Sequence, residues 1–154
     1  MTAVTNPATE PASQDWLLEP VLAPTVTGDV LAPYYEAAAR GELAMPFCSR
    51  CDLALELEQR VCDGCGGTES RWRTVEVAGT VHAATLMHRR EPGLVRAKEP
   101  YPVVDVELRS GHRIVMTTVH PSASAPPVGA SVRIGFRRLG DVVLPAVESV
   151  EVSQ

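Results

Sequence analysis

Short runs of alternating apolar and polar residues fill the second half of the chain, and such alternation is typical of β-strands with one buried face. In the run YPVVDVEL, the apolar side chains from Val104 onward alternate with acidic ones. Glycine-containing turns and the proline-rich stretch HPSASAPPVG, which cannot join a ladder, interrupt the alternation. The pattern predicts five strands, at residues 75–88, 101–108, 112–119, 130–138 and 142–150.

A short helical pattern precedes the strands, at residues 27–41. Thr27 or Asp29 can cap its start, and Pro33 suits a first turn. Gly41 provides a stop. Apolar side chains recur at helical spacing, at Leu31, Tyr34, Tyr35 and Ala38. We expect an amphipathic helix whose tyrosines serve packing more than ligand contact.

The first 26 residues have a different composition, rich in Pro, Thr, Ala and Glu with few large apolar side chains. This composition predicts a mostly disordered tail. Its WLLEPVL stretch either covers its own domain or docks on a partner. A core this small does not bury every apolar side chain, and those left over are candidates for a subunit interface. They include Trp16, Leu17, Tyr34 and Tyr35.

All four cysteines of the chain fall within one short segment, as two CxxC pairs separated by ten residues. They are Cys48, Cys51, Cys62 and Cys65. Two such pairs bring four thiolates to one tetrahedral ion and leave no position for water, so the spacing predicts a structural zinc site. A redox CxxC pair or bound iron are the alternatives, but no βαβ pattern accompanies them. Nearby arginines can offset the negative cluster, at positions 50, 60, 71 and 73.

Together these elements predict a mainly β protein with an N-terminal helix, a rubredoxin-like zinc ribbon and a five-stranded OB-fold barrel. We expect four parts: a disordered or partner-docking tail at 1–26, the amphipathic helix at 27–41, the zinc ribbon at 42–73 and the OB-fold domain at 74–152.

Composition narrows the class of protein further. Hydrophobic residues make up 45% of the 154 residues and charged residues 21%, as in globular proteins. No apolar run is long enough to span a membrane, and the N-terminus lacks the pattern of a signal peptide, so we expect a cytoplasmic protein without a membrane partner. The net charge of -5 disfavours nucleic acid as a partner.

The order of several motifs resembles the DUF35 family of zinc-ribbon OB-fold proteins, which are associated with acyl-CoA. The resemblance lies in YYEAAARGEL, CSRC, CDGCGG, EVAGTVHAATLMHRREPG and YPVVDVEL, and extends from about Tyr34 to Val147. It implies a small non-catalytic subunit that partners a thiolase, a lipid-transfer-type thiolase or aldolase, or, less favoured, a MaoC-type hydratase. The resemblance thus implies a hetero-oligomer that handles a CoA thioester shared with its partner.

One predicted loop gathers the cations of this otherwise acidic chain: Arg89, Arg90, Arg96 and Lys98. Guanidinium groups bind phosphate through paired, charge-assisted hydrogen bonds, so this loop is a candidate site for the phosphates of CoA. A solvated loop is the alternative, since Glu91 and Glu99 dilute the charge. His88 matches the HR of the family's GTV...HR strand and is either a strand-end residue or a further CoA or partner contact.

The chain by itself lacks the residues of an acyl-transfer enzyme. The metal site uses every cysteine, there is no G-x-S-x-G elbow, and the histidines stand outside any catalytic motif. We therefore expect no catalytic residue and no activity without a partner enzyme. The competing hypotheses are a single-stranded nucleic-acid-binding module, for which aromatic residues are scarce, and an assembly subunit with no ligand contact.

Overall fold

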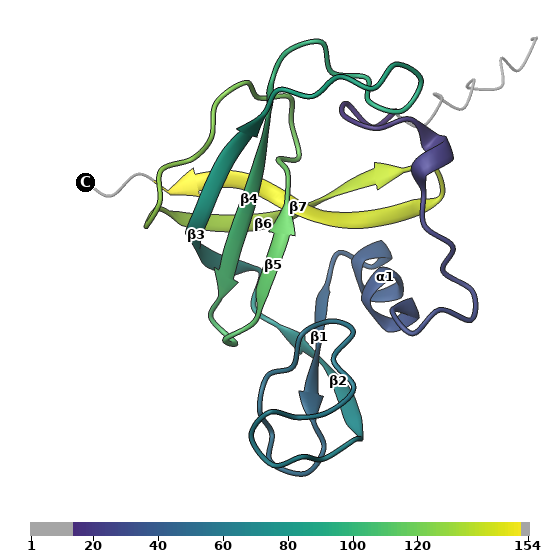
Figure 1. Ribbon diagram of the computed structural model, residues 1–154, viewed down its shortest axis with the longest axis vertical. Coiled ribbons are helices and arrows are strands. Elements are labelled where there is room, and N and C mark those ends of the chain that lie inside the picture. Colours follow the sequence, from purple (N-terminus) through teal and green to yellow (C-terminus); the bar gives the residue numbers. More distant parts are fainter. Residues whose placement is uncertain (1–13, 152–154) are drawn as a thin grey trace, which may run out of the picture.

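The computed structural model describes residues 14–151, which form a β-barrel with a small ribbon projecting from one end (Figure 1). Within this described part, a single short α-helix lies where the ribbon meets the barrel. The elements in chain order are η1 (Pro20–Leu22), α1 (Ala32–Ala39), β1 (Leu43–Cys48), β2 (Ser70–Val75), β3 (Ala78–Met87), β4 (Tyr101–Leu108), β5 (Arg113–Met116), β6 (Ser131–Leu139) and β7 (Val142–Glu151). The predicted mainly β fold class is confirmed.

Five antiparallel strands form the barrel sheet, in the order β5-β4-β3-β6-β7. The chain just after β5 runs parallel to β7 and joins the two edges of the sheet through the bridge between Thr118 and Val147. The Val147 N–H donates to the Thr117 carbonyl at 2.9 Å, and the Val119 N–H donates to the Val147 carbonyl at 2.8 Å. These bonds satisfy backbone groups that an open edge would leave exposed.

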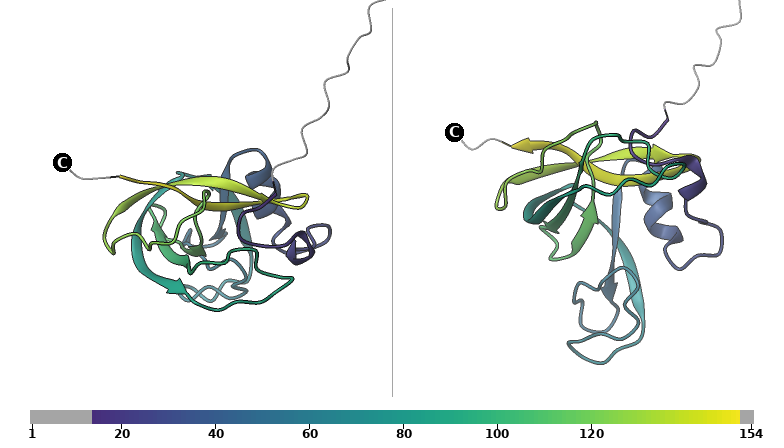
Figure 2. Two further views of the ribbon diagram at one scale, coloured as in Figure 1. Left: turned by 90° about the horizontal axis from the view of Figure 1, so that it is seen from above. Right: turned by 45° about the horizontal axis from the view of Figure 1, so that its top comes forward.

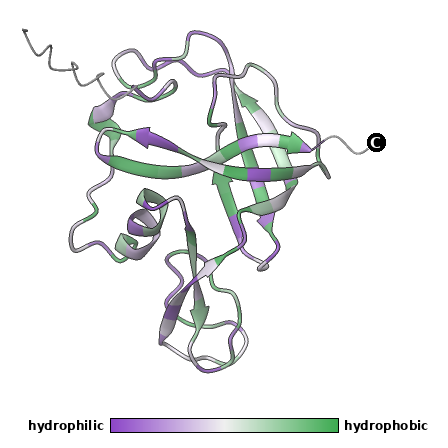
Figure 3. Cartoon of the chain, turned by 180° about the vertical axis from the view of Figure 1, so that it is seen from behind, coloured by the Kyte–Doolittle hydropathy of each residue, from purple (hydrophilic) through white to green (hydrophobic). Residues whose placement is uncertain are grey.

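Alternation along the strands places one face of each in the core, and Figure 3 shows apolar and polar residues changing along the barrel strands. The core combines residues of all five barrel strands with Tyr34 of α1 and with β1. β3 crosses β4 closely at Gly79, where an added Cβ would lie 2.5 Å from the Glu107 carbonyl oxygen. Only glycine permits this approach without displacing the strand.

The element boundaries differ from the prediction where a strand changes its partner. β4 matches the predicted 101–108. β5 is shorter than the predicted 112–119 because Thr117–Val119 pair with β7. The first barrel strand, β3, begins at Ala78 and not at the predicted residue 75, since Val75 belongs to β2 of the ribbon.

The helix also starts later than predicted, at Ala32. The Asp29 carboxylate accepts a hydrogen bond from the Leu31 N–H at 2.8 Å, in the turn that precedes the helix. Pro33 lies in the first turn and Gly41 takes a positive φ of 74° after the last one, as their positions predicted.

The described part of the predicted tail, residues 14–26, packs on the barrel as a strap (Figure 1). Its Leu18 forms a bridge with Val95, and the Glu19 N–H donates to the Leu94 carbonyl at 2.9 Å. Disorder is thus the wrong expectation for this part, because a long-range pairing that composition does not encode holds it; residues 1–13 lie outside the described residues. Leu17 and Tyr34, two candidate partner groups, are 4% and 7% exposed and are covered by their own chain.

The ribbon projects from the barrel (Figure 2). A buried histidine, His112, links the two parts. His112 Nε2–H donates to the Pro46 carbonyl of β1 at 2.7 Å, and its Nδ1 accepts from the Ser110 hydroxyl at 2.7 Å. The imidazole also meets the Phe47 ring edge to face, with centroids 4.8 Å apart. Both ring nitrogens are therefore engaged by the neutral form of His112.

This joint predicts a specific pH dependence. Burial lowers the pKa of His112 below its usual 6.5, although the bond to Pro46 opposes the shift. The unfolded chain therefore binds the proton more readily, so this contribution to stability is complete above pH 6.5 and declines as the pH falls below that value. Each pKa unit of displacement corresponds to about 1.4 kcal/mol.

Urea unfolding at pH 7.5 and 5.5, compared between the wild type and His112→Gln, measures the effect. We expect the wild type to lose more stability on acidification than the variant, which keeps an N–H donor but does not titrate. The thiolates and the exposed histidines contribute equally to both proteins. Equal losses in the two would contradict a titrating His112.

No helix among residues 14–151 is long and apolar enough to cross a membrane.

Candidate functional site

The four cysteines lie on two turns that repeat the same backbone pattern. In the first turn, the Asp52 N–H donates to the Cys48 carbonyl and the Cys48 N–H to the Leu53 carbonyl, at 2.9 and 2.8 Å. In the second turn, the Gly66 N–H donates to the Cys62 carbonyl and the Cys62 N–H donates to the Gly67 carbonyl, both at 2.9 Å. A positive φ follows the second cysteine of each pair, 66° at Asp52 and 73° at Gly66. Each CxxC pair thus makes the tight knuckle that its spacing predicted.

The two knuckles bring the four sulfur atoms together. Cys48 Sγ lies 3.6 Å from Cys65 Sγ, and Cys51 Sγ lies 3.5 Å from Cys62 Sγ. All four sulfurs lie within 4.8 Å of one another. A tetrahedral zinc with sulfur ligands at about 2.3 Å requires sulfur–sulfur separations of about 3.8 Å, so the donor set fits such an ion.

Glycine makes room for this cluster. A Cβ added at Gly67 would lie 3.2 Å from Cys65 Sγ and 3.3 Å from Cys48 Sγ. The Gly67 N–H also points at Cys65 Sγ, at 3.4 Å. Gly66 supplies the positive φ that its position predicted, whereas Gly67 supplies close approach and a backbone donor to sulfur.

At Cys48 the backbone favours the thiolate form that a metal requires, whereas at Cys51 the backbone contact of Leu53 lowers the pKa and the neighbouring Cys62 thiol raises it, with a net rise to about 12. N–H groups of Cys51 and Arg50 lower the pKa of the Cys48 thiol from 9.0 to about 6. Arg71 and Arg73 of β2 both pair with Asp52, and the Arg73 guanidinium lies 3.7 Å from the centre of the Phe47 ring. Two of the arginines predicted to offset the cluster thus contact the acidic residue of the first knuckle.

The cluster uses four thiolates and leaves no open coordination position, so its chemistry is structural. It also supplies most of the ribbon's own small core, in which Cys48, Leu55 and Cys62 are buried together. A metal here would fold the ribbon and would not activate water. The predicted ligands therefore form one four-cysteine cluster that can bind a metal such as zinc.

The predicted phosphate-binding cations all lie in the β3–β4 loop, but the structure does not gather them around one point. Arg89 pairs with Glu91 at 2.6 Å, and Arg90 donates to the Lys98 carbonyl. Arg96 donates to the side chain of Gln14 in the strap. Each arginine thus has a contact within the described chain that holds the loop or the strap.

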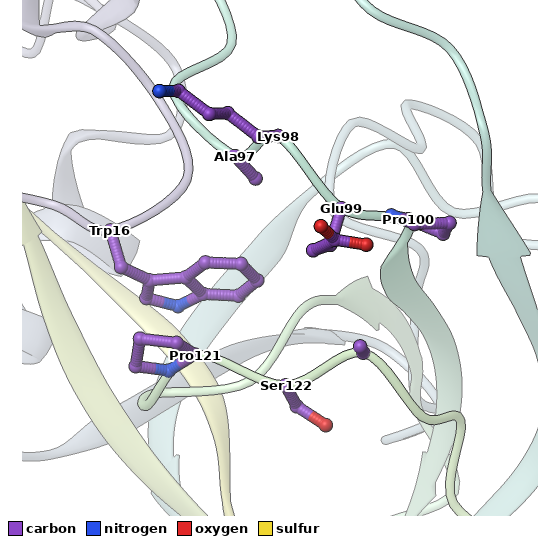
Figure 4. Close-up of a pocket in the computed structure, with 8 residues that line it drawn as sticks. Trp16, Ala97, Lys98, Glu99, Pro100, Pro121 and Ser122 are labelled. Carbon is purple, nitrogen blue, oxygen red and sulfur yellow. The ribbon is translucent and has the colours of Figure 1, made fainter.

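Lys98 has a different setting, at the edge of an open groove of about 340 Å³. Figure 4 shows the Trp16 indole facing into this groove, between Pro121 and the stretch from Ala97 to Pro100. His88 is exposed at the end of β3 and is not among the residues that line the groove. We define this space as the Trp16 groove.

Sequence reasoning missed a second hollow, of about 380 Å³, which Trp16 also lines. His120, Arg137 and Arg138 contribute its basic side chains, and Asp15 lines it as well. The basic side chains come from the proline-rich loop and from β6, whose alternation indicates a strand and gives no sign of a site. Only the packing of the strap brings Trp16 to them.

The outer face of the barrel carries ion pairs. Arg113 pairs with Asp105, and His82 lies 3.8 Å from Glu107 across β3 and β4. These acidic residues form the wet face that their period of two predicted. They offer no aromatic surface on which bases can stack.

The chain thus combines a four-cysteine ribbon with a five-stranded barrel. The two parts are joined through α1 and the buried His112, and this combination defines the class of protein. Residues 72–137 match the family described as "ChsH2, C-terminal OB-fold domain". The solved structure "Ltp2-ChsH2(DUF35) aldolase" is similar with a TM-score of 0.67 and 23% identity, over 82% of this chain and 98% of that one. At this identity the likeness shows the fold.

A curated relative, "Probable enoyl-CoA hydratase alpha subunit" of Thermomonospora curvata, is 31% identical over 86 residues. The match covers 56% of this chain and 26% of the relative, so it spans about a quarter of that protein. The barrel region of this chain thus matches the ChsH2-type OB-fold family over residues 72–137, and this match supports the predicted resemblance to the DUF35 family.

Proposed function

We propose that this chain is a non-catalytic accessory subunit of an acyl-CoA-processing complex, in which it binds a thiolase-superfamily enzyme and helps to position the CoA thioester. The observation that carries the proposal is the match of the barrel to the ChsH2-type OB-fold domain. The name of the similar structure joins a ChsH2 DUF35 chain to an aldolase, which supports a partner of that class. The hydratase name of the Thermomonospora curvata relative makes a MaoC-type hydratase the second candidate partner.

In this proposal the four-cysteine site holds zinc, which folds the ribbon, and chemistry is left to the partner. The four thiols all lie in the cluster, so with a metal bound no cysteine remains to attack a thioester. The Arg89–Lys98 loop is the proposed face toward CoA, with His88 at its start. Because Arg89, Arg90 and Arg96 have contacts in the described chain, Lys98 is the loop cation best placed to meet a phosphate.

The proposed partner surface lies where the ribbon meets the barrel. Two open hollows of about 450 and 500 Å³ meet there at Leu57. Val115 of β5 lines one and Val30 lines the other, and these valines are 65% and 61% exposed. Tyr35 also lines the first hollow and remains a partner candidate. An apolar surface beside a joint suits a subunit of the partner enzyme, whose binding would remove it from water.

The test is to express the tagged chain in its native host and to identify the co-purifying protein by mass. We expect a thiolase-superfamily enzyme, with acyl-CoA turnover in the complex and none in the isolated chain. Recovery of only single-stranded nucleic acid, or turnover by the chain alone, would overturn the proposal.

A charge on the proposed surface should separate the subunits. We expect Val115→Glu to reduce co-purification of the partner at least tenfold, because a carboxylate at an apolar contact loses its hydration without gaining a partner. Val128→Glu is the matched control, since Val128 is 69% exposed in the proline-rich loop outside both hollows. Equal recovery of the partner with both variants would place the interface elsewhere.

A further inference from the structure

Trp16 and Pro121 line both of two neighbouring hollows. The Trp16 groove is mainly apolar and has Lys98 and Glu99 at its edge (Figure 4). The second hollow carries His120, Arg137 and Arg138. An aromatic side chain thus lines a hollow that also contains basic side chains, in an arrangement built by the strap, the β3–β4 loop, the proline-rich loop and β6.

The indole is held in place at its polar edge. Trp16 Nε1–H donates to the Thr118 carbonyl at 2.8 Å. The residues on either side of it, Asp15 and Leu17, are both buried. The ring orientation is therefore set before any ligand arrives, which lowers the entropy cost of stacking on it.

The cations beside the indole differ from those that the sequence singled out. Within residues 14–151, neither Lys98 nor Arg138 forms an ion pair, and Arg138 has only a long contact of its Nε to the Gly140 carbonyl, at 3.3 Å. Arg137 pairs with Asp15 through Nη1, while its buried Nε has no hydrogen-bond partner among these residues. Asp15, which also lines the second hollow, therefore offsets the charge of Arg137, and Arg138 is the arginine of this hollow that has no ion pair within residues 14–151.

We propose that these two hollows bind the 3′-phosphorylated ADP end of CoA, with adenine against Trp16 and the phosphates toward Arg138 and His120. The Glu99 carboxylate can accept a hydrogen bond from the exocyclic amine of adenine, and Lys98 adds a cation at the edge. Inorganic phosphate would use the cations without the indole, and an apolar peptide would use the indole without the cations. A purine nucleotide with several phosphates would use both the indole and the cations. This inference rests on the proposed function only in choosing CoA among such nucleotides.

Calorimetric titration of the full-length, metal-loaded chain tests the inference, with CoA, adenosine 3′,5′-bisphosphate and pantetheine as three separate ligands. We expect the first two to bind with dissociation constants below about 1 mM at low salt and to weaken as salt is added. Pantetheine, which lacks the nucleotide, should not bind. In a Trp72→Phe background, where Trp16 is the remaining indole, both nucleotides should quench its fluorescence.

Charge variants distinguish binding at this site from non-specific electrostatic attraction of the nucleotide to the protein. Arg138→Ala should weaken nucleotide binding about fivefold, as expected for an exposed charge contact. Arg133→Ala is the matched control on the same strand, because Arg133 pairs with Glu148 and lines neither hollow. Trp16→Ala should weaken binding at least about fivefold, and thermal unfolding shows whether the strap survives that change.

Absence of nucleotide binding at several millimolar, equal binding of pantetheine, or equal effects of Arg138→Ala and Arg133→Ala would each overturn the inference. Co-purification of the partner does not depend on these residues. A nucleotide site that fails while the partner is still recovered therefore rejects this inference alone, and loss of the partner with nucleotide binding intact rejects the proposed function alone.

Discussion

Replacement of Cys62 by Ser is expected to abolish metal binding and to unfold the ribbon. Cys62 is 2% exposed, and its sulfur is one of the four that form the cluster. Three thiolates and a hydroxyl hold zinc much less tightly than four thiolates, and a structural zinc site contributes about 10–16 kcal/mol to folding of such a module. The ribbon has little else to hold it, since its separate core consists of the cysteines and Leu55.

The effect should reach the barrel as well. Leu43, Met45 and Phe47 of β1 belong to the main core, so an unfolded ribbon removes three of its apolar side chains. Metal content per chain and urea unfolding measure both consequences. Ser49→Ala, at an exposed position inside the first knuckle, is the control and should keep about one metal per chain. A Cys62→Ser protein with full metal content and wild-type stability would contradict a structural metal site.

The second large effect is expected at the strap, where Asp15→Ala should destabilise the protein by about 3–5 kcal/mol. The Asp15 carboxylate is 1% exposed and accepts from Arg137 Nη1 at 2.6 Å, and the Arg137 side chain is 11% exposed. The same carboxylate accepts the Leu17 and Leu18 N–H groups at 3.2 and 2.8 Å. Its removal leaves a buried guanidinium without its partner and two backbone donors without an acceptor.

The companion variants distinguish an ion pair from simple packing. The double variant Asp15→Ala with Arg137→Met should be more stable than Asp15→Ala alone, because it removes the unpaired charge together with its former partner. Hydrogen exchange of the Leu18 and Glu19 amides reports whether the strap detaches. If Asp15→Ala unfolds at the wild-type urea concentration, the ion pair does not hold the strap.

The parts that local spacing determines were predictable from the sequence. Two CxxC pairs place thiols on turns whose geometry depends only on a few neighbouring residues, and both knuckles form in the same way. The period of two in β4 sorts side chains between core and solvent, so its bounds match the prediction. The ring of Pro33 fixes its own φ, and Gly41 tolerates the positive φ that ends the helix, so both limits depend on single residues.

Features that depend on partners far away in the sequence were not predictable. Asp15 and Arg137 are 122 positions apart, and nothing near either residue indicates the other. The same holds for Trp16 and Thr118, separated by 102 positions. The composition of the strap predicts disorder because composition counts apolar side chains and cannot register a bridge such as that from Leu18 to Val95.

In the cationic loop, the sequence and the tertiary structure each determined a different property. The sequence by itself determined that Arg89, Arg90, Arg96 and Lys98 lie in one loop, since the strands on either side are set by their own alternation. Only the tertiary structure decided which cations are engaged, because Arg96 finds Gln14 in the strap while Lys98 is placed at the Trp16 groove. A charge can be counted along the chain, but its availability to a ligand depends on the groups that folding brings within hydrogen-bond distance.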